Sequence, residues 1–155
     1  MSEIQPGSGI YEDGAYRYAV RVYFEDTDAG GIVYYANYLR FAERARTEML
    51  RLAGFDQSVL LRDVNDPIAF VVKRCVVDYI GMARLDDTLI IETRVMRVSG
   101  ARLEMDQRIL RAVDGIEVAH VTVMLACLSV ARGKGARVPE TIRRALAAYK
   151  VKEQV

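Results

Sequence analysis

The stretch Arg21-Val-Tyr-Phe-Glu-Asp-Thr-Asp-Ala-Gly-Gly-Ile-Val-Tyr-Tyr-Ala-Asn-Tyr-Leu-Arg40 passes from an apolar β-like run through acids and glycines into a helix. Asp26 and Asp28 stand at the end of the run, and Gly30 and Gly31 allow the backbone to turn sharply. The helix that follows begins with N–H groups that have no intrahelical partner, at the positive end of its dipole. Carboxylates and free backbone donors therefore gather within about ten residues, which indicates an active-site corner.

A long amphipathic helix is predicted to follow over residues 37–53, with Asn37 as N-cap and Gly54 as C-cap. Asp56 is expected to cap a further short turn that runs to Leu61. Apolar residues of the long helix recur at steps of three and four, which predicts one buried stripe made of Tyr38, Ala42, Ala45, Met49 and Leu52, widened by Phe41 and Ala53.

The second half of the chain reads as strands separated by short polar or glycine breaks. The apolar and β-branched runs predict strands over residues 68–80, 87–97, 102–112 and 116–130. Apolar and charged residues alternate in the third of these, so we expect one packed face and one face in water. The fourth is apolar on both faces, as in a central strand or a strand at an oligomer interface.

Turn residues and element order then predict the fold class. Asp114-Gly115 predicts a two-residue hairpin between the last two strands, and Pro139 predicts the first turn of a closing helix from Glu140 to Val151. One strand, one long helix and four strands in succession predict an α+β fold. In this fold an antiparallel sheet wraps around a single long helix.

The composition indicates one domain. The chain has 155 residues and is 52% hydrophobic, which is enough for one core and too little for two ordinary domains. We expect a disordered tail over residues 1–14, without the features of a secretory signal, and a domain over residues 15–150. The net charge of +1 is not gathered into blocks, so neither nucleic acid nor an anionic membrane is indicated.

The apolar runs are too short for a membrane span, and the two cysteines favour a reducing compartment. The longest apolar stretch, Val121 to Ala131, is far shorter than a membrane span, so no integral membrane segment is expected. Cys75 and Cys127 lie in strand-like runs without metal-ligand spacing. We therefore expect both to be buried free thiols.

An Asp-x-Asp pair after an apolar strand has other interpretations. In phosphotransferases of the haloacid-dehalogenase type the acids bind magnesium and attack phosphorus, but that fold needs a parallel sheet. A calcium loop carries a bidentate glutamate at its twelfth position, where this chain has Asn37. A purely structural role for Asp26 and Asp28 in turn and cap hydrogen bonds fits the local spacing as well as catalysis does.

The longer pattern resembles a known family. The stretch from Arg21 to Tyr34, followed by Asn37-Tyr-Leu-Arg-Phe-Ala-Glu-Arg-Ala-Arg-Thr-Glu-Met-Leu-Arg51, is similar to the YbgC-type branch of the 4-hydroxybenzoyl-CoA thioesterase family. Ala69-Phe-Val-Val-Lys73 and Ala83-Arg-Leu-Asp-Asp-Thr-Leu89 resemble the same branch, so the likeness spans roughly residues 15–135. The resemblance implies the hotdog fold, assembled as dimers paired through the sheet and often as tetramers; we expect a homotetramer in the cytoplasm.

The resemblance also implies the chemistry: hydrolysis of an acyl-CoA or acyl-carrier-protein thioester, with no metal and no bound cofactor. The family's catalytic carboxylate falls on Asp28, which would attack the thioester carbon or deprotonate a water. A backbone N–H at the helix start, which falls on Tyr35, would polarise the carbonyl. Many YbgC-type sequences have histidine at this position, so any role of a histidine side chain is absent here.

The resemblance further implies the substrate-binding residues. The residues expected to shape the acyl pocket are Ala29, Val33, Tyr34 and Tyr38, with Gly30 and Gly31 also in the substrate site. Three more stand in a turn between strands whose counterpart in the family contacts the nucleotide phosphates of coenzyme A, namely Arg97, Ser99 and Arg102.

Two other titratable residues receive ordinary roles in this interpretation. Another branch of hotdog thioesterases carries its acid on the central helix near the position of Glu43, but an ion pair with Arg46 is the expected role here. His120 is expected to be a hydrogen-bonded packing residue of a central strand rather than a base. A hotdog dehydratase of hydroxyacyl thioesters remains an alternative, as does a non-catalytic acyl-thioester or partner-binding module linked to the Tol-Pal system.

Overall fold

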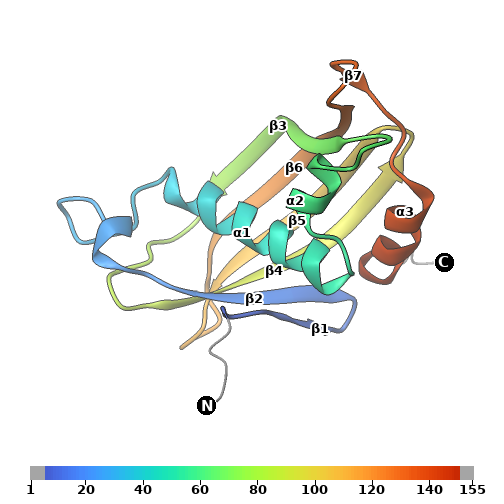
Figure 1. The fold of residues 1–155 in the computed structure, drawn as a ribbon. Coiled ribbons are helices and arrows are strands. Elements are labelled where there is room, and N and C mark those ends of the chain that lie inside the picture. Colours follow the sequence, from blue (N-terminus) through green and yellow to red (C-terminus); the bar gives the residue numbers. More distant parts are fainter. Residues whose placement is uncertain (1–5, 151–155) are drawn as a thin grey trace, which may run out of the picture.

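One antiparallel sheet forms the body of the molecule, and the long helix α1 (Asn37–Leu52) lies across one face of it (Figure 1). The computed structural model describes residues 6–150. The sheet has the order β1-β2-β4-β5-β6-β3, with β7 beside β6. The strands are β1 (Ile10–Glu12), β2 (Ala15–Arg21), β3 (Ile68–Tyr79), β4 (Thr88–Ser99), β5 (Arg102–Arg111), β6 (Glu117–Ser129) and β7 (Lys134–Gly135).

Short helices complete the fold: α2 (Gln57–Leu61) follows α1, and α3 (Glu140–Leu146) packs near the chain's end. Two single 3-10 turns, η1 (Phe24–Asp26) and η2 (Ala147–Tyr149), stand after β2 and α3. The predicted α+β arrangement of one long helix and an antiparallel sheet is confirmed. The four predicted strands of the second half are present within two residues at each end.

The ends of α1 differ slightly from the prediction. Ala36, not Asn37, is the N-cap, because the Asn37 side chain bonds to the main chain of residue 26 instead. At the other end the Gly54 N–H donates to Arg51 O at 3.0 Å and the Phe55 N–H to Leu50 O at 2.9 Å. These two bonds form a Schellman motif, in which Gly54 takes the left-handed conformation with φ of +100°.

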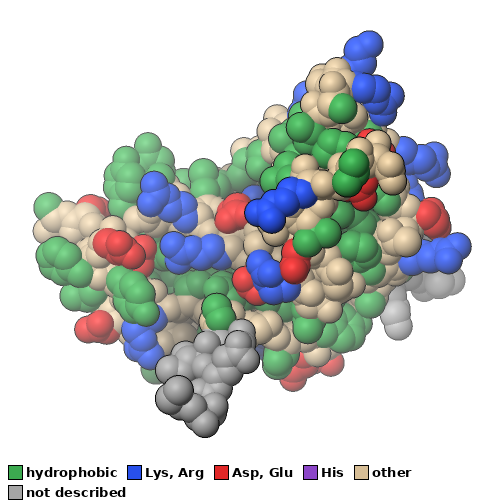
Figure 2. Space-filling view, in the orientation of Figure 1, with side chains coloured by type: hydrophobic (Ala, Val, Ile, Leu, Met, Phe, Trp, Pro, Cys, Tyr) green, Lys and Arg blue, Asp and Glu red, His purple; other side chains and the backbone are tan. Residues whose placement is uncertain are grey.

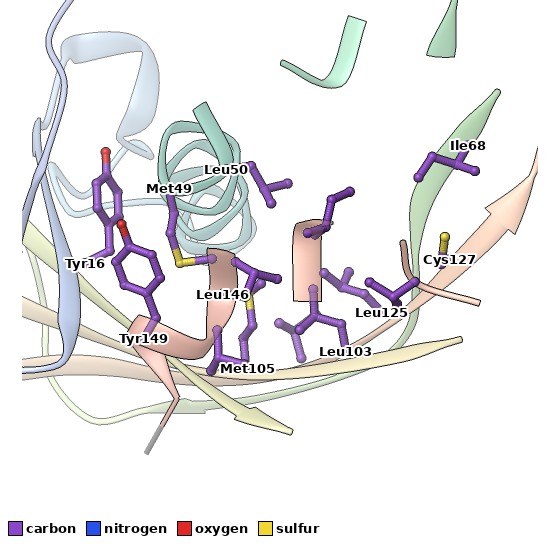
Figure 3. Close-up of a cluster of buried hydrophobic side chains, with 14 of the residues drawn as sticks. Tyr16, Met49, Leu50, Ile68, Leu103, Met105, Leu125, Cys127, Leu146 and Tyr149 are labelled. Atoms are coloured by element: carbon purple, nitrogen blue, oxygen red, sulfur yellow. The ribbon is translucent and has the colours of Figure 1, made fainter. Parts of the chain in front are cut away.

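Two hydrophobic clusters hold α1 against the sheet. The first lies under its C-terminal half, where Met49 and Leu50 meet Leu103, Met105 and other buried side chains of the sheet and α3 (Figure 3). The second lies under the N-terminal half and includes Phe41. Fully burying a side chain of this size contributes about 1.5–3 kcal/mol, so both halves of α1 are firmly placed. Leu50 occupies the buried stripe, whereas Leu52, which we expected there, is 48% exposed.

Two turn predictions need correction. The connection between β5 and β6 is longer than a two-residue hairpin, because the Arg111 N–H bonds Ile116 O and Gly115 takes the left-handed conformation within a four-residue loop. Pro139 is the N-cap of α3 rather than a residue of its first turn, and α3 ends at Leu146 before η2. The part of the predicted closing helix beyond residue 150 lies outside the described residues.

The two ends of the sheet order are very different edges. Residues 10–12, expected in a disordered tail, form β1, which pairs with β2 through three residues; residues 1–5 of that tail lie outside the described residues. The opposite edge is β3, twelve residues long, which exposes Val72 and Val76. Cys75 is also exposed on β3, contrary to the expected burial, whereas Cys127 is buried; both thiols are free. Within residues 6–150 no helix is long and apolar enough to cross a membrane.

Candidate active site

The corner between η1 and α1 is a tight loop that presents Asp28. A β-bridge between Thr27 and Val33 closes the loop, the Asp28 N–H donates to Ile32 O at 2.8 Å, and the Gly31 N–H donates to Asp28 O at 3.1 Å. Gly31 has φ of +75°, which L side chains rarely adopt. The Asp28 carboxylate is exposed, and its Oδ1 accepts the Gly30 N–H at 2.8 Å. One carboxylate oxygen is thus oriented by the backbone of the turn.

Asp26 is the buried neighbour that ties the loop to the helix. The residue is 7% exposed, and its side-chain Oδ2 accepts the Tyr23 N–H at 2.8 Å. Its carbonyl oxygen accepts the Tyr34 N–H at 2.9 Å and the Asn37 side-chain amide at 2.8 Å. Both parts of Asp26 are engaged in holding the chain, which leaves Asp28 as the acid that faces outward.

Tyr35 stands between the loop and α1 with its N–H free. The N–H of the preceding residue, Tyr34, donates to Asp26 O, and the Asn37 N–H donates to Tyr34 O at 2.8 Å. Within residues 6–150 the Tyr35 N–H has no hydrogen-bond acceptor. A free donor at the positive end of a sixteen-residue helix suits a developing negative charge.

Residues 80–87 support the corner from the far side. The Val33 N–H donates to Ala83 O at 2.9 Å, and Ile32 and Arg84 form a β-bridge. The Ala83 N–H donates to the Tyr38 hydroxyl at 3.3 Å. These contacts give a physical reason for the family-like sequence over residues 83–89, because that segment backs the glycine turn.

The residues expected around the acyl group divide by burial. Val33 and Tyr38 are 4% and 3% exposed and pack in the cluster under the start of α1. Burial raises the pKa of Tyr38, so its phenol is neutral. Tyr34 and Tyr35 are 46% and 60% exposed, with ring centroids 4.9 Å apart. Figure 2 shows hydrophobic side chains gathered on the protruding end that carries this corner.

The expected phosphate-binding residues meet in a hollow at the other end of the sheet. Arg97, Ser99 and Arg102 line a cavity of about 300 Å³ together with Ala101 and Glu104, at the two-residue turn between β4 and β5. The corner adjoins the first residues of β4, and Arg97 lies nine residues further along the same strand. Nine steps at about 3.3 Å span roughly 30 Å. Within one chain the cavity and Asp28 are therefore not brought together. Figure 1 shows the turn between β4 and β5 at the opposite end of the sheet from the loop that precedes α1.

Glu43 does not form the expected ion pair. Its Oε1 accepts the Thr47 hydroxyl at 2.6 Å, whereas the Arg46 guanidinium turns inward and donates to Gln107 Oε1 at 2.9 Å. Burial lowers the pKa of Arg46, and the charge of Glu43 only partly opposes this effect. Beneath α1 the partner of Arg46 is thus a neutral amide oxygen, and not the Glu43 carboxylate.

His120 is hydrogen-bonded, as expected, and lies on the face of the sheet opposite α1. Its Nε2 is 2.5 Å from Asp106 Oδ1, and Nδ1 is 3.9 Å from Glu117 Oε1. Its neighbours in β6, Ala119 and Val121, are buried on the helix side, so the half-exposed imidazole lies on the opposite face. Asp106 is fourteen positions away and is not recognisable as a partner until β5 and β6 pair.

Sequence reasoning missed two further residues of the corner. Asn37 was assigned as a cap, yet its amide joins the loop to α1. Tyr79, at the end of β3, donates its hydroxyl to Tyr35 O at 3.3 Å. A tyrosine ending a long apolar run is the available signal, but its contact depends on the path of β3. Among residues 6–150 no group of three or more His, Cys, Asp or Glu side chains is placed to hold a metal ion.

Comparison with known proteins places this geometry in a family. The sequence model of the thioesterase-like superfamily matches residues 22–146. The chain is 44% identical over 133 residues to the acyl-CoA thioesterase YbgC of Haemophilus influenzae, covering 86% of this chain and 95% of that protein. It is 42% identical over 127 residues to the acyl-CoA thioester hydrolase YbgC of an Escherichia coli O6:H1 strain, covering 82% and 92%.

A solved structure agrees with these sequence matches. The crystal structure of a probable thioesterase from Bartonella henselae superposes with a TM-score of 0.76 at 36% identity, covering 81% of this chain and 99% of that one. The sheet, the central helix and the sequence likeness coincide over nearly the whole relative. The chain therefore belongs to the thioesterase-like superfamily, as a YbgC-type member with the hotdog fold.

Proposed function

We propose that the protein hydrolyses acyl-CoA thioesters to the free acid and coenzyme A, with Asp28 as the reacting carboxylate. One observation carries the proposal: a single tight turn presents the Asp28 carboxylate and leads directly into the free N–H of Tyr35. Thioester hydrolysis needs an attacker at the carbonyl carbon and a donor at its oxygen, and these two groups supply both. The YbgC relatives, named as acyl-CoA thioesterases, support the same activity.

The reaction can follow two routes from this arrangement. In one, an Asp28 oxygen bonds to the carbonyl carbon and the C–S bond breaks, so that the coenzyme A thiolate departs. The acyl group then remains on Asp28 as a mixed anhydride, which water cleaves. In the other, Asp28 takes a proton from a water whose oxygen bonds to the carbonyl carbon, and the C–S bond then breaks to release the free acid and the coenzyme A thiolate, which takes up that proton. In both routes negative charge develops on the carbonyl oxygen, where the Tyr35 N–H stabilises it.

The decisive test is release of free thiol from a panel of acyl-CoAs, followed with a thiol reagent. The panel should contain short, long and aromatic acyl groups, and matching acyl-carrier-protein thioesters. We expect catalytic turnover on at least one class. Binding without thiol release across the whole panel would contradict hydrolysis and favour a non-catalytic binding module, including one that serves the Tol-Pal system.

The dehydratase alternative lacks support at the site. Such chemistry pairs a histidine with an acid near the helix, whereas His120, the single histidine of the chain, lies on the opposite face of the sheet.

We place the enzyme in the cytoplasm, because an exposed free thiol such as that of Cys75 suits a reducing compartment.

The site also needs a second copy of the chain. Asp28 and Tyr35 are exposed in the single chain, although hydrogen bonds to developing charge act most strongly where water is excluded. The long, partly apolar edge of β3 has no pairing strand among residues 6–150. Such an edge is a template for pairing with another chain. We therefore propose a dimer in which two β3 strands pair antiparallel about a twofold axis, as the building unit of a homotetramer.

This pairing would bring the two expected halves of the substrate site together. The Tyr79 end of β3 is the Asp28 end of the molecule, since Tyr79 contacts Tyr35. The Ile68 end is the phosphate-cavity end, since Ile68 pairs with Ser129 and the nearby Ala126 pairs with Arg102. Antiparallel pairing places the Ile68 end of one copy beside the Tyr79 end of the other. The acyl-CoA would then have its thioester at Asp28 and its phosphates at the partner's Arg102.

Subunit complementation tests this arrangement. Arg102→Ala should raise KM about tenfold through loss of a charge-assisted hydrogen bond, while Asp28→Asn should lower kcat at least about 100-fold. Co-expressed as a mixed dimer with two affinity tags, the two variants rebuild one complete site across the interface. We expect low-KM turnover that neither homodimer has. If the mixed dimer shows only the high KM of Arg102→Ala, each site lies within one chain and the proposed pairing is wrong.

A further inference from the structure

Tyr79 contacts the free-donor turn across 44 positions of sequence. Its hydroxyl donates to the Tyr35 carbonyl oxygen at 3.3 Å, and its ring lies edge to face against the Tyr35 ring with centroids 6.0 Å apart. The Tyr38 ring, in the first turn of α1, lies 5.9 Å away. A single side chain from the edge strand β3 therefore touches both the donor residue and the start of the helix.

The Tyr35 N–H lies in the peptide plane that joins Tyr34 to Tyr35, and the next peptide plane constrains it through the backbone torsions of Tyr35. The first plane joins Tyr34 to Tyr35: its oxygen accepts the Asn37 N–H at 2.8 Å, and a planar trans peptide directs the Tyr35 N–H the opposite way. The second plane joins Tyr35 to Ala36, and its oxygen is the acceptor for Tyr79. Local hydrogen bonds within the turn fix the first plane, and β3 fixes the second.

We propose that Tyr79 is a positioning residue for thioester hydrolysis, which anchors Tyr35 so that its N–H points at the substrate carbonyl. The inference rests on the proposed function of this site. The anchor is indirect: the Tyr79 hydroxyl donates to the Tyr35 carbonyl oxygen and does not itself contact the substrate. It also links the donor to β3, the strand through which we propose that subunits pair. The free donor is therefore held by both the local turn and the sheet edge.

The chemistry of the phenol suits this role. Desolvation, and then the nearby Tyr35 phenol, raise the pKa of Tyr79 above its ordinary value. A raised pKa keeps the hydroxyl protonated throughout the neutral range, so it stays a hydrogen-bond donor to the Tyr35 carbonyl. The edge-to-face contact between the Tyr35 and Tyr79 rings also restricts the orientation of Tyr35, which the hydrogen bond of the hydroxyl alone would not do.

Tyr79→Phe tests the anchor, because it keeps the ring and removes the hydrogen bond. We expect kcat to fall about three- to tenfold with KM within about twofold of the parent, since the donor acts mainly on the transition state. Amide hydrogen exchange should also quicken in peptides covering residues 30–41. Tyr11→Phe is the matched control: Tyr11 is 49% exposed against 48% for Tyr79, and its hydroxyl donates to Ala148 O at 2.8 Å, away from the corner.

The two readouts separate this inference from the proposed function. If the parent enzyme releases thiol and Tyr79→Phe matches Tyr11→Phe in kcat and in exchange over residues 30–41, the anchor is refuted while hydrolysis stands. An equal loss in both variants would show a general stability effect and also refute the anchor. If the parent releases no thiol from any acyl-CoA, the proposed function fails, and faster exchange in Tyr79→Phe alone would still establish the Tyr79 to Tyr35 contact.

Discussion

Asp28→Asn is expected to lower kcat for the best acyl-CoA by at least about 100-fold while the protein keeps its fold. Removing a general base or nucleophile costs this much or more, because an amide neither attacks a carbonyl nor accepts the proton of a water. The fold should be insensitive, since Asn has the same shape and its side-chain oxygen can still accept the Gly30 N–H. Thiol release gives kcat, and thermal unfolding reports the fold.

Glu25→Gln is the matched control for this variant. Glu25 is exposed in η1, three residues away, and within residues 6–150 its side chain has no hydrogen bond or ion pair. Glu25→Gln removes one negative charge near the corner, as Asp28→Asn does, but leaves the Asp28 carboxylate in place. We therefore expect the kcat of Glu25→Gln to stay within about twofold of the parent, as for most surface substitutions. Equal activity of Asp28→Asn and Glu25→Gln would refute Asp28 as the reacting group.

The predictability of the fold follows how local each signal is. The stripe of α1 and the alternation of β5 are read from neighbours three, four or two positions apart, and both were predicted correctly in outline. The exchange of Leu52 for Leu50 shows the limit of this reading. The sheet and α3 surround the end of α1, so tertiary packing decides which side of the last turn is buried.

The candidate site divides in the same way. The turn chemistry of residues 26–35 is local, so its acids, glycines and free donor could be identified from sequence and family resemblance. Contacts that join distant strands could not: Tyr79 reaches Tyr35, and Asp106 reaches His120, only after the strands are paired. The separation of Arg102 from Asp28 likewise depends on the direction of β4 and β5, which a motif does not report.

A second large effect is expected beneath α1, where Gln107→Leu should lower the free energy of unfolding by about 3 kcal/mol. Gln107 is fully buried, and its oxygen accepts the Arg46 guanidinium at 2.9 Å. Its amide donates to Ala42 O at 2.9 Å and to the Thr93 hydroxyl at 3.0 Å. Leucine is of similar size, so the loss comes from a desolvated guanidinium left without this partner. For a chain of this length, the midpoint temperature of thermal unfolding should fall by roughly 10 °C.

Double substitution distinguishes an unpaired charge from a packing defect. Arg46→Met removes the guanidinium, so Gln107→Leu added to it should cost much less than it does alone, giving a coupling free energy of about 1–3 kcal/mol in denaturant unfolding. Gln57→Leu is the control, because that amide donates to the half-buried Thr47 hydroxyl, which is a neutral group, and its loss should cost under about 1 kcal/mol. Additive costs for Arg46→Met and Gln107→Leu would mean that the pair does not act as a unit. The hydrophobic clusters alone would then hold the start of α1 at the corner.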